Sequence, residues 1–133
     1  MVEFYSISNF RERIQALLDI KKGVYAGVVQ EIYAAFKDMS IEMIRNNRDM
    51  ILLDDPLIVI KLRLPDHKHK LSKKDGFRLI YMTYKNEEKV VFLDIYPKNG
   101  PLQQLDITDN DLLDLLAMYN SETKGGLLQQ YLL

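Results

Sequence analysis

The chain has 133 residues, a formal net charge of −1, 47% hydrophobic residues and 28% charged residues. This length predicts a single domain spanning residues 1–133, and the balanced composition argues against disorder. The absence of cysteine excludes disulfides and thiolate metal sites. No apolar run approaches the roughly 18 residues of a membrane span, and the first residues do not resemble a signal peptide. We therefore expect a soluble, cytoplasmic protein that does not contact a membrane.

The first third of the chain predicts a strand followed by helices. Residues 2–7 combine β-branched and aromatic side chains without a breaker, which favours a strand. Ser8 or Asn9 can cap the next element by accepting a hydrogen bond from a free backbone N–H. Apolar residues then recur every three or four positions through residues 10–36, which indicates helix. The glycine in Lys22–Gly23 predicts either two helices that break there or one long bent helix.

The middle of the chain changes to strand patterning. A short helical segment over residues 40–48 is expected to precede it. Two runs of apolar and β-branched residues flank an Asp-Asp-Pro turn, and two more flank a charged four-residue turn, so both pairs predict antiparallel hairpins. The predicted strands comprise residues 50–53, 57–64, 77–84 and 89–96.

The clearest helix start lies near the C-terminus. Thr108 and Asp111 form a T-x-x-D capping box, and an apolar stripe follows as far as Tyr119. The terminal LLQQYLL, residues 127–133, either completes the core or contacts a partner. The predicted fold class is α+β, with an N-terminal strand and helices packed on an antiparallel sheet of three to five strands, and a C-terminal helix.

Basic residues gather in the middle of the chain. The segment 61–78 holds seven Lys or Arg against two Asp, a net +5, which leaves −6 for the rest. Side chains alternate across a strand, so each predicted strand presents a basic or tyrosyl side chain on one face. If the strands adjoin, five such side chains converge on one patch: Lys61, Arg63, Arg78, Tyr96 and Lys98. The lysines of the intervening loop would lie at its edge: Lys68, Lys70, Lys73 and Lys74.

Such a patch suits a phosphodiester backbone. Arginine offers a planar fork for phosphate, lysine a point charge, and tyrosine a ring on which bases stack. The alternative is that these residues line a solvated sheet face. His67 and His69 lie two residues apart without a further ligand, so we expect no metal and no other cofactor.

Three segments resemble the RelE/ParE toxin superfamily of bacterial toxin–antitoxin modules. They are IKLRLP at 60–65, DGFRLIY at 75–81 and VVFLDIYPKNG at 90–100, in the order and spacing of the family. The resemblance implies a toxin that cleaves mRNA on the ribosome without a metal, by attack of a ribose 2′-hydroxyl on the adjacent phosphate. It implies mRNA, the ribosome and a cognate antitoxin protein as partners, and it leaves a homodimer open.

The resemblance also implies residue roles. Arg78 matches the strand arginine that stabilises transition-state charge, whereas Lys61 and Arg63 match basic strand positions that bind RNA or assist proton transfer. Lys98 falls near the basic residue that follows the last strand. The family often has a Tyr or His beyond that strand; residues 99–105 contain neither, so Tyr96 is the candidate substitute. Three other functions stay open: a catalytically inactive binding or regulatory protein of RelE fold, a ParE-like gyrase inhibitor, and a generic RNA-binding α+β module.

Overall fold

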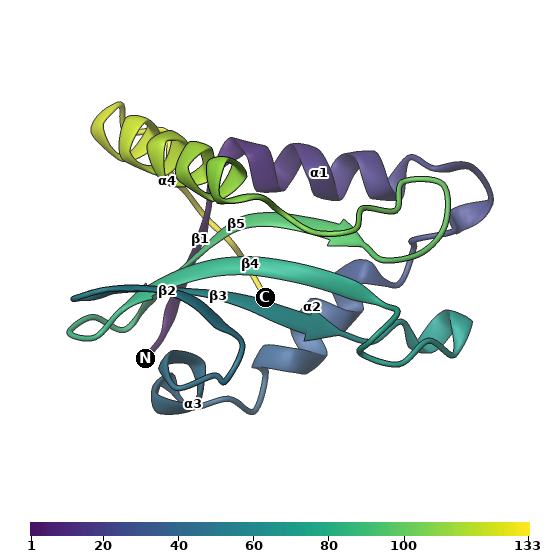
Figure 1. Cartoon of the computed structure of the whole chain (residues 1–133), viewed down its shortest axis with the longest axis horizontal. Coiled ribbons are helices and arrows are strands. Elements are labelled where there is room, and N and C mark those ends of the chain that lie inside the picture. Colours follow the sequence, from purple (N-terminus) through teal and green to yellow (C-terminus); the bar gives the residue numbers. More distant parts are fainter.

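A computed structural model describes all residues, 1–133. Four α-helices and six strands follow one another along the chain (Figure 1), with short 3₁₀ turns at Lys21–Gly23 and His67–His69. The elements are β1 (Glu3–Ser6), α1 (Ser8–Leu18), α2 (Val28–Phe36), α3 (Ile41–Arg45), β2 (Met50–Asp54), β3 (Leu57–Leu64), β4 (Phe77–Tyr84), β5 (Lys89–Pro97), α4 (Asp109–Lys124) and β6 (Gln129–Gln130).

The α+β class is confirmed, but the sheet is larger than predicted and is not purely antiparallel. Its order is β2-β3-β4-β5-β1-β6, and the β2 to β5 meander consists of the two predicted hairpins. β1 lies parallel to β5, and β6 pairs antiparallel with β1. β1 has four residues and β6 has two, which is too short a pattern to reveal the partner or direction of either strand. The sequence therefore left the pairings of β1 and β6 undetermined.

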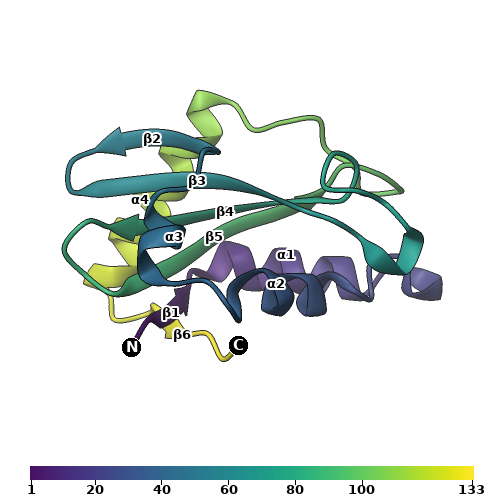
Figure 2. The ribbon, with the colours of Figure 1, turned by 90° about the horizontal axis from the view of Figure 1, so that it is seen from below.

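Helices cover both faces of the sheet, as the two views in Figures 1 and 2 show. α2 and α3 pack on one face, where the Tyr81 hydroxyl donates to the Ile44 carbonyl at 2.8 Å. α4 packs on the other face, where the hydroxyls of Tyr84 and Tyr119 lie 3.2 Å apart. The two central strands are therefore buried almost throughout. This double burial explains why apolar residues occupy both alternating sets of positions in β4 and β5.

The helix ends match the predictions in part. The capping box of Thr108 and Asp111 is present at the start of α4, and the chain breaks into two helices around Lys22, which has φ of +67°. The prediction of a local cap for α1 was wrong. The carboxylate of Glu122 in α4 accepts from both the backbone N–H and the hydroxyl of Ser8, each at 2.8 Å. A cap supplied from 114 residues away cannot be recognised in local sequence.

The C-terminal tail takes part in the core. Tyr131 packs edge-on against Phe92 and Phe10, with ring centroids 5.1 and 5.5 Å away. Leu127 and Leu132 nevertheless remain exposed. The tail therefore contributes one aromatic anchor and closes the sheet through β6. None of the helices is both long and apolar enough to cross a bilayer.

Candidate phosphate-binding site

Strand register assembles a row of polar side chains on the α4 face of the sheet. Arg63 of β3 pairs with Arg78 of β4, and Arg78 pairs with Tyr96 of β5, so the three lie in line across adjacent strands. Lys61 lies two residues before Arg63 on the same face. We call Lys61, Arg63, Arg78 and Tyr96 the basic row. The register thus brings together four of the five side chains for which strand alternation predicted convergence.

Residues 65–76 connect β3 to β4, and we call them the lysine loop. Arg78 is buried, and much of its hydrogen-bonding capacity serves this loop. One terminal nitrogen, Nη1, donates to the carbonyls of Lys73 at 2.7 Å and Phe77 at 3.2 Å, and Nη2 donates to the carbonyl of Lys74 at 2.9 Å. Burial lowers the pKa of the guanidinium from its ordinary value. Of its five N–H donors, Nε–H and one Nη2–H have no partner in the chain. Arg78 therefore positions the loop and keeps a two-donor edge for a ligand.

Lys61 and Tyr96 converge on one carboxylate that the sequence patterns did not predict to lie in the site. Asp106 Oδ1 accepts from Lys61 Nζ at 2.8 Å and from the Tyr96 hydroxyl at 3.3 Å. The hydrogen bond from Lys61 is the main cause that lowers the pKa of Asp106. Burial, followed by the charge of Asp106, raises the pKa of Tyr96. The phenol is therefore a proton donor at neutral pH, not a base.

Arg63 lies at the open edge of the sheet, where β2 no longer covers β3. Its Nε faces Asp49 Oδ2 at 3.4 Å, and the two side chains are 39% and 24% exposed. Lys73 shares with Arg63 a hollow of about 420 Å³ between β3 and the chain segment after α3. Lys73 is therefore the loop lysine that adjoins the basic row.

The other loop lysines are placed differently. Lys68 Nζ donates to the Gly23 carbonyl at 3.1 Å, on the helical side of the loop. Lys70 has φ of +56°, and both Lys70 and Lys74 are exposed and form no ion pair. The four loop lysines predicted to lie at the edge of the patch are thus separated. Lys73 lies beside the basic row, whereas Lys68 contacts the backbone at Gly23.

Two buried carboxylates fix the first half of the loop. Glu31 of α2 accepts from the backbone N–H of His67 at 2.6 Å and faces the imidazole Nδ1 at 2.9 Å. Asp66 Oδ2 faces His69 Nδ1 at 2.9 Å, while its Oδ1 is buried without a partner in the chain. Glu31 thus holds the start of the loop against α2, whereas the contact between Asp66 and His69 lies within the loop.

Residues 98–107, which we call the strap, run from the end of β5 back to the start of α4 (Figure 1). Lys98 Nζ donates to the Leu105 carbonyl, so this predicted site residue braces the strap and does not extend the basic row. Gln104 is held on both sides, because its N–H donates to the Pro97 carbonyl at 3.0 Å and its Oε1 accepts from Arg13 at 2.7 Å.

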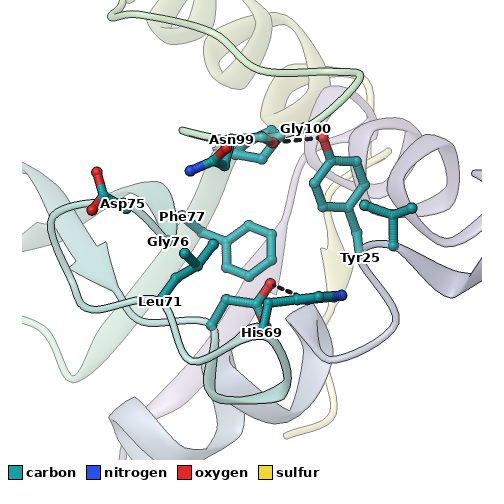
Figure 3. A pocket seen from close by; sticks show the side chains of 11 residues that line it. Tyr25, His69, Leu71, Asp75, Gly76, Phe77, Asn99 and Gly100 are labelled. Atoms are coloured by element: carbon teal, nitrogen blue, oxygen red, sulfur yellow. Dashed lines mark hydrogen bonds and ion pairs between the residues drawn. The ribbon is translucent and has the colours of Figure 1, made fainter.

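The start of the strap is fixed beside a pocket of about 260 Å³ (Figure 3). The Tyr25 hydroxyl donates to the Asn99 carbonyl at 2.7 Å and accepts from the Leu102 N–H at 2.9 Å. Gly100 has φ of +83°, and a Cβ there would lie 2.7 Å from the Tyr25 hydroxyl oxygen. Glycine at position 100 is therefore required both by backbone conformation and by the close approach of Tyr25.

A second carboxylate on the same sheet face is buried and does not contact the basic row. Asp94 of β5 is 7% exposed, and its Oδ1 accepts from Arg13 Nε at 3.0 Å and from the Ile95 N–H at 2.8 Å. Burial raises the pKa of Asp94, opposed by the charge of Arg13. The contact of Arg13 with Asp94 could not be predicted from the sequence, because nothing in a local helix pattern shows which strand the helix will approach.

No protein-family model matches this chain, and no curated protein matches it either. The chemistry that the site permits is the binding of an oxyanion. Lys61, the free edge of Arg78 and the Tyr96 hydroxyl are donors on one rigid sheet face, and donors arranged in this way bind phosphate or carboxylate.

Proposed function

We propose that the chain is a RelE-like toxin of a bacterial toxin–antitoxin module that binds mRNA through the basic row and cleaves it on the ribosome. The observation that carries the proposal is the cross-strand register, which aligns Arg63 with Arg78 and Tyr96 and sets Lys61 beside them. In this proposal a cognate antitoxin protein holds the toxin inactive, and the proposed activity inhibits translation.

The row supports named roles in 2′-hydroxyl attack on the adjacent phosphate. The free edge of Arg78 would face the phosphate and stabilise charge that develops there. Tyr96, whose pKa is raised by burial, would donate its proton to the departing 5′-oxygen. Lys61 and Arg63 would hold the backbone, with Lys73 beside them, and the proton of the attacking 2′-hydroxyl would pass to water.

A second candidate is an RNA-binding or regulatory protein of the same fold that does not cut. A specific observation favours it: Lys61 contacts Asp106 and Arg63 faces Asp49, so two of the cations are already paired with carboxylates. Arg78 also donates two hydrogen bonds to loop carbonyls, those of Lys73 and Lys74, and a third to the Phe77 carbonyl at the start of β4. A row so engaged can bind RNA weakly without being organised for catalysis.

The test is induced expression in a bacterial host, with growth followed and mRNA 5′ ends mapped. Lys61→Gln and Tyr96→Phe alter the row, and Lys124→Gln is the matched control because Lys124 is an exposed lysine of α4 without an ion pair. Growth arrest with new cuts that Lys61→Gln and Tyr96→Phe abolish and Lys124→Gln retains would support the toxin.

The other results separate the alternatives. RNA binding in vitro that requires Lys61, without arrest or cuts, would favour the non-cutting protein. Arrest with intact mRNA would contradict the ribonuclease and point to another target. Neither arrest nor RNA binding by the folded protein would overturn both candidates.

A further inference from the structure

The carboxylate of Asp106 sits where the basic row would receive an anion. Its Oδ1 accepts from Lys61 Nζ at 2.8 Å, from the Ile107 N–H at 2.8 Å and from the Tyr96 hydroxyl at 3.3 Å. A hollow of about 210 Å³ adjoins it, lined in part by Lys61 and Asp109. We infer that Asp106 is an internal ligand that occupies the phosphate subsite of the basic row and that an external phosphate must displace it. The extension from phosphate to RNA rests on the proposed function.

The carboxylate of Asp106 and an external phosphate compete for the single hydroxyl proton of Tyr96, so only one of them can accept it at a time. A tyrosine hydroxyl carries a single hydrogen, and in this structure the Tyr96 hydroxyl donates it to Asp106. A phosphate oxygen that accepts this hydrogen must therefore take the place of the carboxylate. The two anions also repel each other near Lys61, because they would share one ammonium charge.

The exposures show which side of the contact can move. Tyr96 is 1% exposed and belongs to a central strand, and the side chain of Lys61 is 27% exposed. The side chain of Asp106 is 60% exposed and belongs to the strap. Exposed loop groups open at lower free-energy cost than groups within a sheet. Displacement would therefore move Asp106 and leave the donors in place.

The strap is anchored independently of this carboxylate. Tyr25 holds its start through Asn99 and Leu102, and the capping box of Thr108 and Asp111 begins the helix that follows. Release of Asp106 thus requires neither the sheet nor α4 to unfold. The contact has the properties of an autoinhibitory latch, because the exposed side chain of Asp106 can exchange partners while the rest of the strap and the start of α4 stay in place.

The test compares Asp106→Ala with Asp109→Ala. Both substitutions remove one negative charge from the hollow beside Lys61, but Asp109 forms no hydrogen bond or ion pair with the basic row. Affinity for a single-stranded RNA is measured by fluorescence anisotropy at fixed salt. We expect about tenfold tighter binding for Asp106→Ala and less than about twofold for Asp109→Ala, since only the first frees two charge-assisted donors. Asp106→Asn retains an acceptor without the charge and is expected to fall between them.

Inorganic pyrophosphate is the second probe, with binding followed by NMR at Lys61 and Tyr96. Tighter binding of pyrophosphate to Asp106→Ala than to Asp109→Ala supports the latch even if no variant binds RNA, in which case the proposed function fails alone. Equal effects of the two substitutions on both probes would overturn the latch, because general charge would then explain them. Unchanged binding of both probes by folded Asp106→Ala would overturn it as well.

Discussion

The basic row and the lysine loop meet at Arg78 but are held in place in different ways. Sheet register positions the row, and Lys61 and Arg63 face carboxylates that are themselves partly exposed, Asp106 and Asp49. The loop is positioned by buried groups. Arg78 binds its backbone carbonyls, and Glu31 accepts from its backbone at 2.6 Å.

This contrast separates charges that can exchange partners from charges that fix the structure. An exposed carboxylate can be replaced by a phosphate at little cost, because water already solvates it. A buried donor or acceptor that loses its partner incurs its full desolvation cost. A run of basic residues in sequence therefore contains two functions, and burial distinguishes them.

The largest predicted effect is that of Arg78→Ala. It leaves the carbonyls of Lys73 and Lys74 without their donors and removes a side chain from a buried strand, so the free energy of unfolding should fall by about 3 kcal/mol. Urea denaturation measures this loss. Amide hydrogen exchange should also accelerate through residues 72–76 more than in β5.

Arg63→Ala is the matched comparison, because it removes the same side chain from the adjacent strand. Its contact with Asp49 is long at 3.4 Å and partly exposed, so the loss should stay below about 1 kcal/mol. If Arg78→Ala and Arg63→Ala lowered the free energy of unfolding equally, the basic row and the lysine loop would not differ in how they are held in place.

The sequence predicted the parts of the fold that depend on local pattern. Strand alternation identified the side chains of the row, and the capping box identified the start of α4. The sequence could not show Asp106 meeting Lys61, because that contact joins residues 45 positions apart through an irregular segment. The cap supplied by Glu122 and the loop contacts of Arg78 depend in the same way on tertiary packing that local pattern does not encode.

Glu31→Gln tests the loop from the helical side. The buried carboxylate accepts from the His67 backbone and faces the imidazole, so loss of its charge should lower the free energy of unfolding by about 1.5 kcal/mol. The control is Glu12→Gln, at an exposed position of α1. Similar stabilities of the two variants would mean that burial of Glu31 does not fix the loop.

Tyr25→Phe tests the anchor of the strap. The ring stays against Phe77, with centroids 6.1 Å apart, but the hydroxyl contacts with Asn99 and Leu102 are lost. The expected cost is about 1 kcal/mol, with faster amide exchange at Leu102. Tyr33→Phe, on the exposed face of α2, should change neither quantity. Unaltered exchange at Leu102 in Tyr25→Phe would show that the strap does not depend on this hydroxyl.

The smallest predicted effect is a pH dependence that distinguishes the two carboxylates beside β5. Burial raises the pKa of Asp94, so the folded state binds its proton more tightly than the unfolded state does. Its contribution to stability is full below the unfolded pKa of about 3.9 and is lost as the pH rises through the folded value. Asp94→Asn should therefore gain stability relative to the unsubstituted protein as the pH rises from acid to neutral.

Asp106 should show the opposite sign. The hydrogen bond from Lys61 lowers the pKa of Asp106, so its contribution is present above the unfolded pKa and is lost as the pH falls through the folded value. The measurement is urea unfolding of Asp94→Asn, Asp106→Asn and the exposed control Asp38→Asn from acid to neutral pH. It gives the change in the free energy of unfolding with pH that each carboxylate causes. The same sign for Asp94 and Asp106 would mean that the charge of Arg13 outweighs burial at Asp94. Opposite signs would separate a buried carboxylate, whose protonated form burial favours, from an exposed one, whose charged form the hydrogen bond from Lys61 stabilises.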